Sequence, residues 1–187
     1  MNVILTGMRG TGKSSIGALL ADRLAYAFVD TDTAIEALAG CPIAAIVAQH
    51  GWDHFRALER QIVAQIATSD HQVIAAGGGT LIDQANVAHL KAGGIVVLLL
   101  CDIELLQRRL RQESHRPPLT AQGSAVDELT HVWQARQPHY YAAADLVYDV
   151  SVQSADLTID LHEKAKTLHH LLEQHGRFRS DAARRAP

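Results

Sequence analysis

A glycine-rich segment near the amino terminus gives the clearest chemical signal in this sequence. Residues 7–14 read Gly-Met-Arg-Gly-Thr-Gly-Lys-Ser, which fits the P-loop pattern GxxxxGK[ST]. The segment follows a short apolar run and precedes a stretch of helical periodicity, which is the context that a P-loop requires. Such a loop turns successive backbone N–H groups toward phosphate oxygens at the start of a helix, where the helix dipole favours negative charge. The segment therefore predicts a binding site for a nucleoside triphosphate.

Individual residues of this loop have predicted roles. Lys13 can reach the β- and γ-phosphates as a mobile charge, and the Ser14 hydroxyl can bind Mg²⁺. The loop residues that we assign to the nucleotide are Gly10, Thr11, Gly12, Lys13, Ser14 and Ser15. A P-loop serves phosphotransferases, GTPase switches and inert nucleotide sensors alike, so the groups that could hold an acceptor must decide between them.

Two carboxylates follow the apolar run at residues 27–29. Ligands gather at the carboxyl ends of parallel strands, so Asp30 and Asp32 should face the same cleft as the P-loop. In an extended segment, residues two apart point to the same side. One carboxylate could hold a metal-bound water while the other receives or orients a hydroxyl. The alternative is that Asp32 or Thr31 only caps a helix that begins near Thr33.

Arginines and glycines further along the chain could bind an acceptor. Glu59 lies one helical turn after Arg56 and can hold its guanidinium in place, although an isolated helical arginine is usually a surface charge. Residues 77–79 are three glycines after a predicted strand, which permit close backbone approach to a ligand unless they form a loose loop. Arg136 together with Arg56 could grip a carboxylate in bidentate fashion.

The chain between these groups alternates apolar bursts with helical stretches. The bursts lie at residues 3–5, 27–29, 73–76, 95–100 and 146–148. They lack polar alternation and contain β-branched or aromatic residues, which is typical of strands buried on both faces. Apolar stripes at 16, 19, 20 and 24 and at 161, 165, 168 and 172 predict helices. This alternation predicts an α/β fold with helices on both faces of a parallel sheet.

Two segments interrupt the alternation. Residues 112–123 contain two prolines and a glycine without apolar periodicity, and we expect a lid there that carries Arg116 over the transferring phosphoryl group. Residues 176–187 hold four arginines and one aspartate, which makes them locally +3 and leaves residues 1–175 at −6. We interpret residues 1–175 as one domain and residues 176–187 as a basic, flexible tail.

Composition excludes several other classes of protein. The chain has 187 residues, of which 48% are hydrophobic and 20% charged, and its net charge of −3 speaks against nucleic acid or anionic membrane as a partner. The longest apolar run, residues 95–101, is far shorter than the roughly 20 residues of a spanning helix. We see no signal peptide and expect a cytoplasmic protein in which Cys41 and Cys101 are reduced thiols.

Together these motifs resemble those of the shikimate kinase family, over about residues 1–172 and in the family's order and spacing. The motifs are the P-loop, Asp30-Thr31-Asp32, Phe55-Arg56-x-x-Glu59, Gly77-Gly78-Gly79, Arg116-Pro117-Pro118-Leu119 and Arg136-x-Pro138-x-Tyr140. The resemblance implies a three-layer α/β/α P-loop kinase fold with a five-stranded parallel sheet and a mobile lid. It also implies a monomer that uses ATP with Mg²⁺ to phosphorylate the 3-hydroxyl of shikimate.

The resemblance further implies a role for each group. Asp32 meets the substrate hydroxyl as base or orienter, and the two arginines grip the carboxylate. The implied contacts are Arg56, Gly77, Gly78, Gly79 and Arg136 to substrate, Lys13 and Arg116 to phosphates, Ser14 and Asp30 to the metal, and Arg109 and Gln153 to adenine.

Some features keep alternatives open. Trp52 stands where the family usually has Glu, and Ala75-Ala76 stand where a hydroxyl residue is common. Another small-molecule kinase, acting on gluconate or a nucleoside monophosphate, is one alternative. A non-catalytic ATP-binding module is the other, and it predicts loss of Asp32, Lys13 or Arg116, all of which are present.

Overall fold

A computed structural model describes residues 1–112, 128–152, 154 and 156–178 of the chain. Within these residues, five strands form one parallel sheet in the order β2-β3-β1-β4-β5. The strands are β1 Asn2–Thr6, β2 Ala27–Asp30, β3 Gln72–Ala75, β4 Gly94–Leu100 and β5 Leu146–Asp149. All the predicted apolar bursts are therefore strands, and the predicted α/β fold with a five-stranded parallel sheet is confirmed.

The strands differ in how deeply they are buried. β1, β3 and β4 occupy the middle of the sheet and are almost wholly buried. β2 and β5 lie at its edges, where Phe28 is 37% exposed and Val147 is 44% exposed. The prediction that all five strands are buried on both faces is thus wrong for β2 and β5, because an edge strand has a neighbour on one side only.

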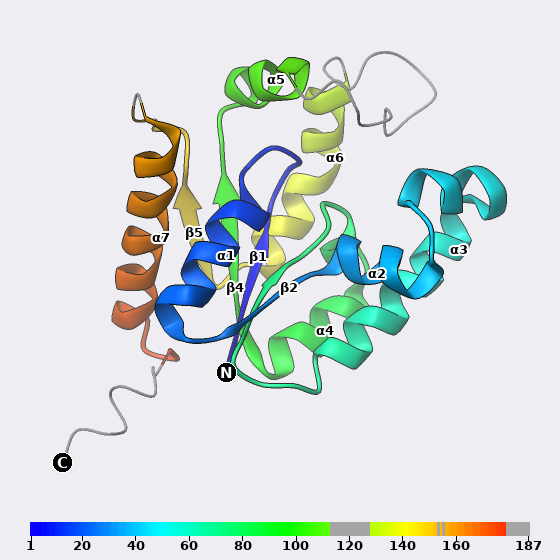
Figure 1. Ribbon diagram of the computed structural model, residues 1–187, viewed down its shortest axis with the longest axis horizontal. Coiled ribbons are helices and arrows are strands. Elements are labelled where there is room, and N and C mark those ends of the chain that lie inside the picture. Colours follow the sequence, from blue (N-terminus) through cyan, green and yellow to red (C-terminus); the bar gives the residue numbers. More distant parts are fainter. Residues whose placement is uncertain (113–127, 153, 155, 179–187) are drawn as a thin grey trace.

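Helices cover both faces of the sheet, as Figure 1 shows. They are α1 Lys13–Leu24, α2 Thr31–Ala39, α3 Ile43–Ile66, α4 Gln84–Ala92, α5 Ile103–Gln112, α6 Glu128–Ala143 and α7 Leu157–Gln174, with a short 3₁₀ turn, η1, at Thr80–Ile82. Val3 and Leu5 of β1 pack with residues of α1 and α7 on one face. Ile4, which points to the opposite face, packs with residues of α3, α4 and α6. The apolar stripes predicted for α1 and α7 are the faces that these helices bury.

The packed chain extends a little beyond the boundary that we expected at residue 175. Phe178 is buried and joins the core cluster formed by β1, α1 and α7. Gly176, Arg177 and Phe178 therefore belong to the packed domain rather than to a tail, because an aromatic ring gains more from burial than from hydration. Residues 179–187 lie outside the described residues.

Two features of α2 and α3 bear on the site and on the class of protein. α3 is broken at Gly51, whose φ of 80° and ψ of 173° are not helical, so a second helical segment begins at Trp52. No single helix within the described ranges is long and apolar enough to span a membrane. Helices α2 and α3 reach that length and apolar composition only when they are taken together, and they are bent by 88° relative to each other. Cys41 and Cys101 are both free thiols, as expected.

The sheet order explains how distant motifs come together. β1, β3 and β2 are neighbours, and they are parallel, so their carboxyl ends lie at one edge. The P-loop follows β1, Asp30 ends β2, and the three glycines follow β3. This edge is where ligands bind in open α/β sheets.

Candidate active site

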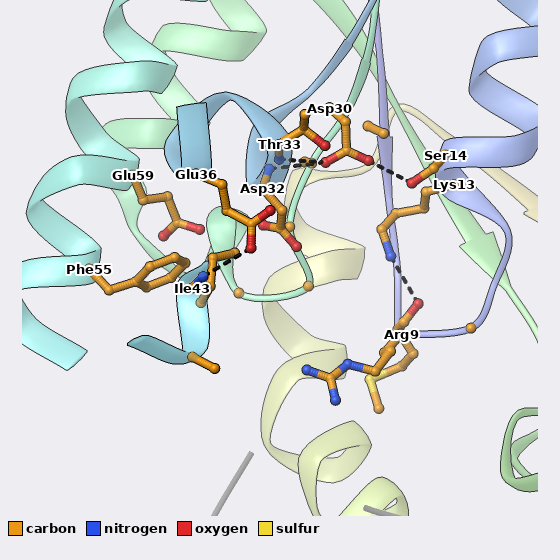
Figure 2. A pocket seen from close by; sticks show the side chains of 18 of the residues that line it. Arg9, Lys13, Ser14, Asp30, Asp32, Thr33, Glu36, Ile43, Phe55 and Glu59 are labelled. Carbon is orange, nitrogen blue, oxygen red and sulfur yellow. Dashed lines mark hydrogen bonds between the residues drawn. The ribbon is translucent and has the colours of Figure 1, made fainter. Parts of the chain in front are cut away.

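A pocket of about 920 Å³ opens at this edge of the sheet, a volume that suits small ligands and cofactors. Its walls come from the P-loop, the end of β2, the glycines after β3, and helices α3 and α6. Figure 2 shows Lys13 and Ser14 on one side of the pocket, with Phe55 and Glu59 of α3 on the other. The predicted site residues that line it are Gly10, Gly12, Lys13, Ser14, Ser15, Asp30, Asp32, Arg56, Gly77, Gly78, Gly79 and Arg136.

The P-loop has the backbone that its sequence predicts. Gly10 and Gly12 adopt φ values of 83° and 88°, which residues with a side chain rarely reach, and Gly12 is the N-cap of α1. Lys13 Nζ donates to the carbonyl oxygens of Gly7 and Met8 at 3.0 and 2.9 Å. The loop thus brings a helix amino terminus and an ammonium group to the pocket, which is the environment that binds phosphate.

Ser14 and Asp30 form a pair between α1 and β2. The Ser14 hydroxyl donates to Asp30 Oδ2 at 2.6 Å, as Figure 2 shows. Hydroxyl and carboxylate oxygens are the donors that Mg²⁺ takes from proteins, usually one or two beside water and phosphate oxygens. This pair therefore fits a Mg²⁺ ion that arrives with a nucleotide. Among the residues that the structure describes, no group of three or more His, Cys, Asp or Glu side chains could hold a metal by itself.

Asp30 also caps α2, which corrects the alternative that we gave to Asp32 or Thr31. Its Oδ1 accepts hydrogen bonds from the backbone N–H of Asp32 at 3.0 Å and of Thr33 at 3.3 Å. The helix begins at Thr31, so Asp32 belongs to its first turn. The two carboxylates therefore do not share an extended segment, as we had expected. Both nevertheless line the pocket, because a strand end and the first turn of the next helix face the same edge.

Each of the three consecutive glycines contacts a different polar side chain of the pocket. A Cβ atom on Gly77 would lie 2.5 Å from Asp32 Oδ1, and one on Gly79 would lie 2.5 Å from Arg56 Nη2. A Cβ atom on Gly78 would lie 3.3 Å from Arg136 Nη1. None of the three has a positive φ. Glycine leaves room here for these side chains to lie against the backbone, whereas the sequence suggested only that a ligand would.

A buried carboxylate fixes Arg56 to the glycine turn. Arg56 Nη1 donates to Glu59 Oε2 at 2.6 Å, which confirms the predicted i,i+3 pair. Glu59 is 1% exposed, and its Oε1 accepts a hydrogen bond at 2.8 Å from Thr80, the residue after the last glycine. The bond between Arg56 and Glu59 is charge-assisted, and such bonds are shorter and stronger than neutral ones. It therefore holds the guanidinium at the pocket wall.

Arg136 and Tyr140 of α6 both bind the middle glycine. The carbonyl oxygen of Gly78 accepts a hydrogen bond from Arg136 Nη1 at 3.0 Å and another from the Tyr140 hydroxyl. Burial raises the pKa of Tyr140 above its usual range, so this hydroxyl stays protonated and remains a donor at neutral pH. Both residues belong to the motif Arg136-x-Pro138-x-Tyr140, but the sequence did not indicate that Tyr140 supports the glycine turn.

Four of the predicted nucleotide contacts are not among the described residues that line the pocket. Thr11 is buried, and its hydroxyl donates to the Met8 carbonyl at 2.9 Å, so its side chain shapes the loop and does not line the pocket. Arg109 does not line the pocket either; its Nη1 donates to the Gly10 carbonyl at 2.8 Å and thereby ties α5 to the P-loop. Arg116, Gln153 and almost all of the expected lid at 112–123 lie outside the described residues.

Sequence reasoning missed some polar residues of the pocket. Arg9, in a variable position of the P-loop, lines the pocket, as does Glu36 of α2. Glu36 Oε1 also accepts the backbone N–H of Ile43 at 2.9 Å and so fixes the start of α3. The Thr31 hydroxyl accepts a hydrogen bond from the Gly77 N–H at 2.8 Å. The only sequence signal for Arg9 and Thr31 was that both lie inside recognised motifs, and Glu36 had none.

One small pocket is thus lined by a P-loop, an oxygen pair that suits Mg²⁺, a carboxylate and two arginines. This set of groups defines a P-loop phosphotransferase that acts on a small acceptor. Comparison with known proteins agrees. The family model described as shikimate kinase matches residues 9–173. The shikimate kinase of Thermosynechococcus vestitus is 43% identical over 158 residues, covering 84% of this chain and 85% of that protein. The one from Geobacter metallireducens is 41% identical over 155 residues, covering 83% and 86%.

Solved structures show the same relationship. A shikimate kinase from Acinetobacter baumannii in complex with shikimate is 28% identical, with a TM-score of 0.84 over 94% of both chains. One from Bacteroides thetaiotaomicron is 26% identical, with a TM-score of 0.83 over 92% of this chain and 98% of that chain. The chain belongs to the shikimate kinase family of ATP-dependent phosphotransferases, which acts in aromatic amino acid biosynthesis.

Proposed function

We propose that this protein transfers the γ-phosphoryl group of ATP to the 3-hydroxyl of shikimate, with Arg56 and Arg136 binding the substrate carboxylate. The observation that carries the proposal is that these two guanidinium groups contact neighbouring glycines, Gly79 and Gly78. Glu59 offsets only one of the two positive charges, while the described partner of Arg136 is a neutral carbonyl. Two cations that converge in this way suit one small anion, and each charge-assisted bond to it contributes roughly 1.5–3 kcal/mol.

Asp32 is the group that meets the acceptor hydroxyl in this proposal. Its Oδ1 lies against Gly77, two residues before the glycine that contacts Arg56, so the carboxylate and the cations meet different parts of one bound molecule. The hydroxyl oxygen attacks the γ-phosphorus while the bond to the β–γ bridging oxygen breaks and ADP leaves. The hydroxyl proton passes to Asp32 or to solvent. A loose transition state demands little base strength, so orientation by Asp32 is as effective as proton removal.

The nucleotide end of the site consists of the P-loop with Gly10, Gly12, Lys13, Ser14 and Ser15. Lys13 moves from the Gly7 and Met8 carbonyls to the phosphates when ATP binds. Ser14 and Asp30 hold Mg²⁺, directly or through water, and the ion when bound neutralises charge on the β- and γ-phosphates. We place Arg116 over the transferring group and Arg109 and Gln153 near adenine, as the family resemblance implies. We also propose that the protein acts as a monomer.

A coupled assay of ADP release tests the proposal. With shikimate as acceptor we expect turnover in the range of about 1–100 s⁻¹, and with gluconate or AMP only background release. Asp32→Asn should lower kcat by orders of magnitude while the Kd for ATP, measured by titration calorimetry, barely changes. Preference for gluconate or AMP would replace the proposed acceptor. An unchanged kcat in Asp32→Asn would remove Asp32 from the reaction while leaving the acceptor assignment in place.

A further inference from the structure

Trp52 lies beside Arg56 at the wall of the pocket, and nothing above assigns it a role. It is 43% exposed and lines the pocket. It opens the helical segment that follows the break at Gly51, and Arg56 lies four positions after it. Positions i and i+4 of a helix share a face, so the Trp52 ring and the arginine lie on the same side of this segment.

The guanidinium of Arg56 is surrounded on several sides. Its Cζ atom lies 5.7 Å from the ring centroid of Trp52 and 5.1 Å from that of Phe55. The two rings are nearly perpendicular, at 88°, with centroids 5.6 Å apart. Glu59 holds the same guanidinium by its hydrogen bond, and Gly79 lies against it. Contacts at these distances are cation–π interactions, which are attractive and directional but leave the hydrogen-bonding edge of the guanidinium available.

We propose that Trp52 is a positioning residue for substrate binding, which holds Arg56 with its N–H groups directed toward the carboxylate of the acceptor. A neutral ring restrains the guanidinium without adding a second carboxylate that would compete with the substrate for its N–H donors. Glu59 fixes one side of the group from the buried end, and Trp52 restrains it from the exposed end. This inference rests on the proposed role of Arg56 in carboxylate binding.

The test is a kinetic comparison of Trp52→Leu and Trp52→Phe. Leucine keeps apolar volume but has no π face, so the KM for shikimate should rise about 5-fold, equivalent to about 1 kcal/mol. Phenylalanine should restore most of the affinity. We expect kcat and the KM for ATP to stay unchanged, because Trp52 is not among the nucleotide-binding groups. The unfolding midpoint should fall only slightly, because the ring is half-exposed and Phe55 is its buried aromatic contact. Tyr141→Leu is the matched control, since Tyr141 is similarly exposed at 48% but does not line the pocket.

A double-mutant cycle shows whether Trp52 acts through Arg56. Arg56→Gln should itself raise the KM for shikimate, and Trp52→Leu should then add no further increase. If the two effects are additive, or if Trp52→Leu leaves the KM unchanged, the positioning role is overturned while the proposed function stands. If Arg56→Gln leaves the KM unchanged, the carboxylate assignment itself fails, and the two failures are therefore distinguishable.

Discussion

The close approach of Gly79 to Arg56 allows a sharp test of the substrate site. The backbone of Gly79, at φ −111° and ψ −6°, is accessible to alanine, so Gly79→Ala introduces no backbone strain. Its new Cβ atom would lie 2.5 Å from Arg56 Nη2, 2.9 Å from Nη1 and 3.0 Å from Cζ. These distances are far inside van der Waals contact, so the guanidinium must move away from the glycine turn.

The size of the effect follows from what the displaced group does. Arg56 is partly exposed and can move into the pocket, but this move weakens its bond to buried Glu59, so the cost to folding should be about 1.5–3 kcal/mol. The loss of one charge-assisted contact to the substrate carboxylate costs roughly 1.5–3 kcal/mol. At 25 °C this corresponds to a rise of about 10- to 160-fold in the KM for shikimate.

The assay measures KM for shikimate at saturating ATP, together with the unfolding free energy from a urea titration. Gly93→Ala is the matched control, because Gly93 has a similar φ of −118° and a Cβ there would meet nothing closer than 4.0 Å. We expect the control to leave both quantities unchanged. A Gly79→Ala enzyme whose KM stays within twofold of the parent would refute the placement of Arg56 on the substrate. A loss of stability well above about 3 kcal/mol would instead show that the substitution disturbs more than the Arg56–Glu59 pair.

Further predictions concern the Mg²⁺ site, the bond from Tyr140 to the glycine turn, and the pH dependence of folding stability. Asp30→Asn should keep the α2 cap, since Asn caps as well as Asp, but raise the free Mg²⁺ concentration needed for half-maximal activity; an unchanged Mg²⁺ titration would remove Asp30 from the metal site. Tyr140→Phe should lower the unfolding free energy by about 1 kcal/mol through loss of its bond to Gly78, as urea titration can measure. Burial raises the pKa of Asp160, but hydrogen bonds from Lys164 and a backbone amide outweigh it and hold that pKa below the usual 3.8. The ionised pair therefore stabilises the fold above about pH 4 and is lost as pH falls; Asp160→Asn should cost about 3 kcal/mol at pH 7 and flatten acid denaturation.

Much of the fold and part of the site follow from local sequence. The P-loop is recognisable because its glycines, lysine and serine act within eight residues of one another and need no distant partner. The strands are recognisable because central parallel strands are continuously apolar. The Arg56–Glu59 pair follows from helix geometry alone. In each case the feature depends on residues that are close together in the sequence, so their types and spacing are enough to predict it.

What the sequence could not predict depends on contacts between distant segments. Nothing near Asp30 indicates that it, rather than Asp32, caps α2 while also accepting a hydrogen bond from Ser14. Phe178 stands between two arginines in the sequence, and only its packing against β1, α1 and α7 explains its burial. Arg109 resembles any helical arginine until α5 is packed beside the P-loop. These positions are determined by packing, which has no short-range sequence pattern.

The glycine turn shows how such distant contacts would produce specificity in the proposed site. Gly77, Gly78 and Gly79 follow one another, yet the side chains against them come from three helices, α2, α6 and α3 respectively. A molecule bound along this turn therefore meets a carboxylate at one end and two guanidinium groups at the other. An acceptor of the right shape that lacks an anionic group would leave both guanidinium groups with Glu59 as their sole described carboxylate partner at the turn. The resulting loss of free energy weakens binding of such an acceptor, before any phosphoryl transfer. It arises only because the turn has no side chains of its own.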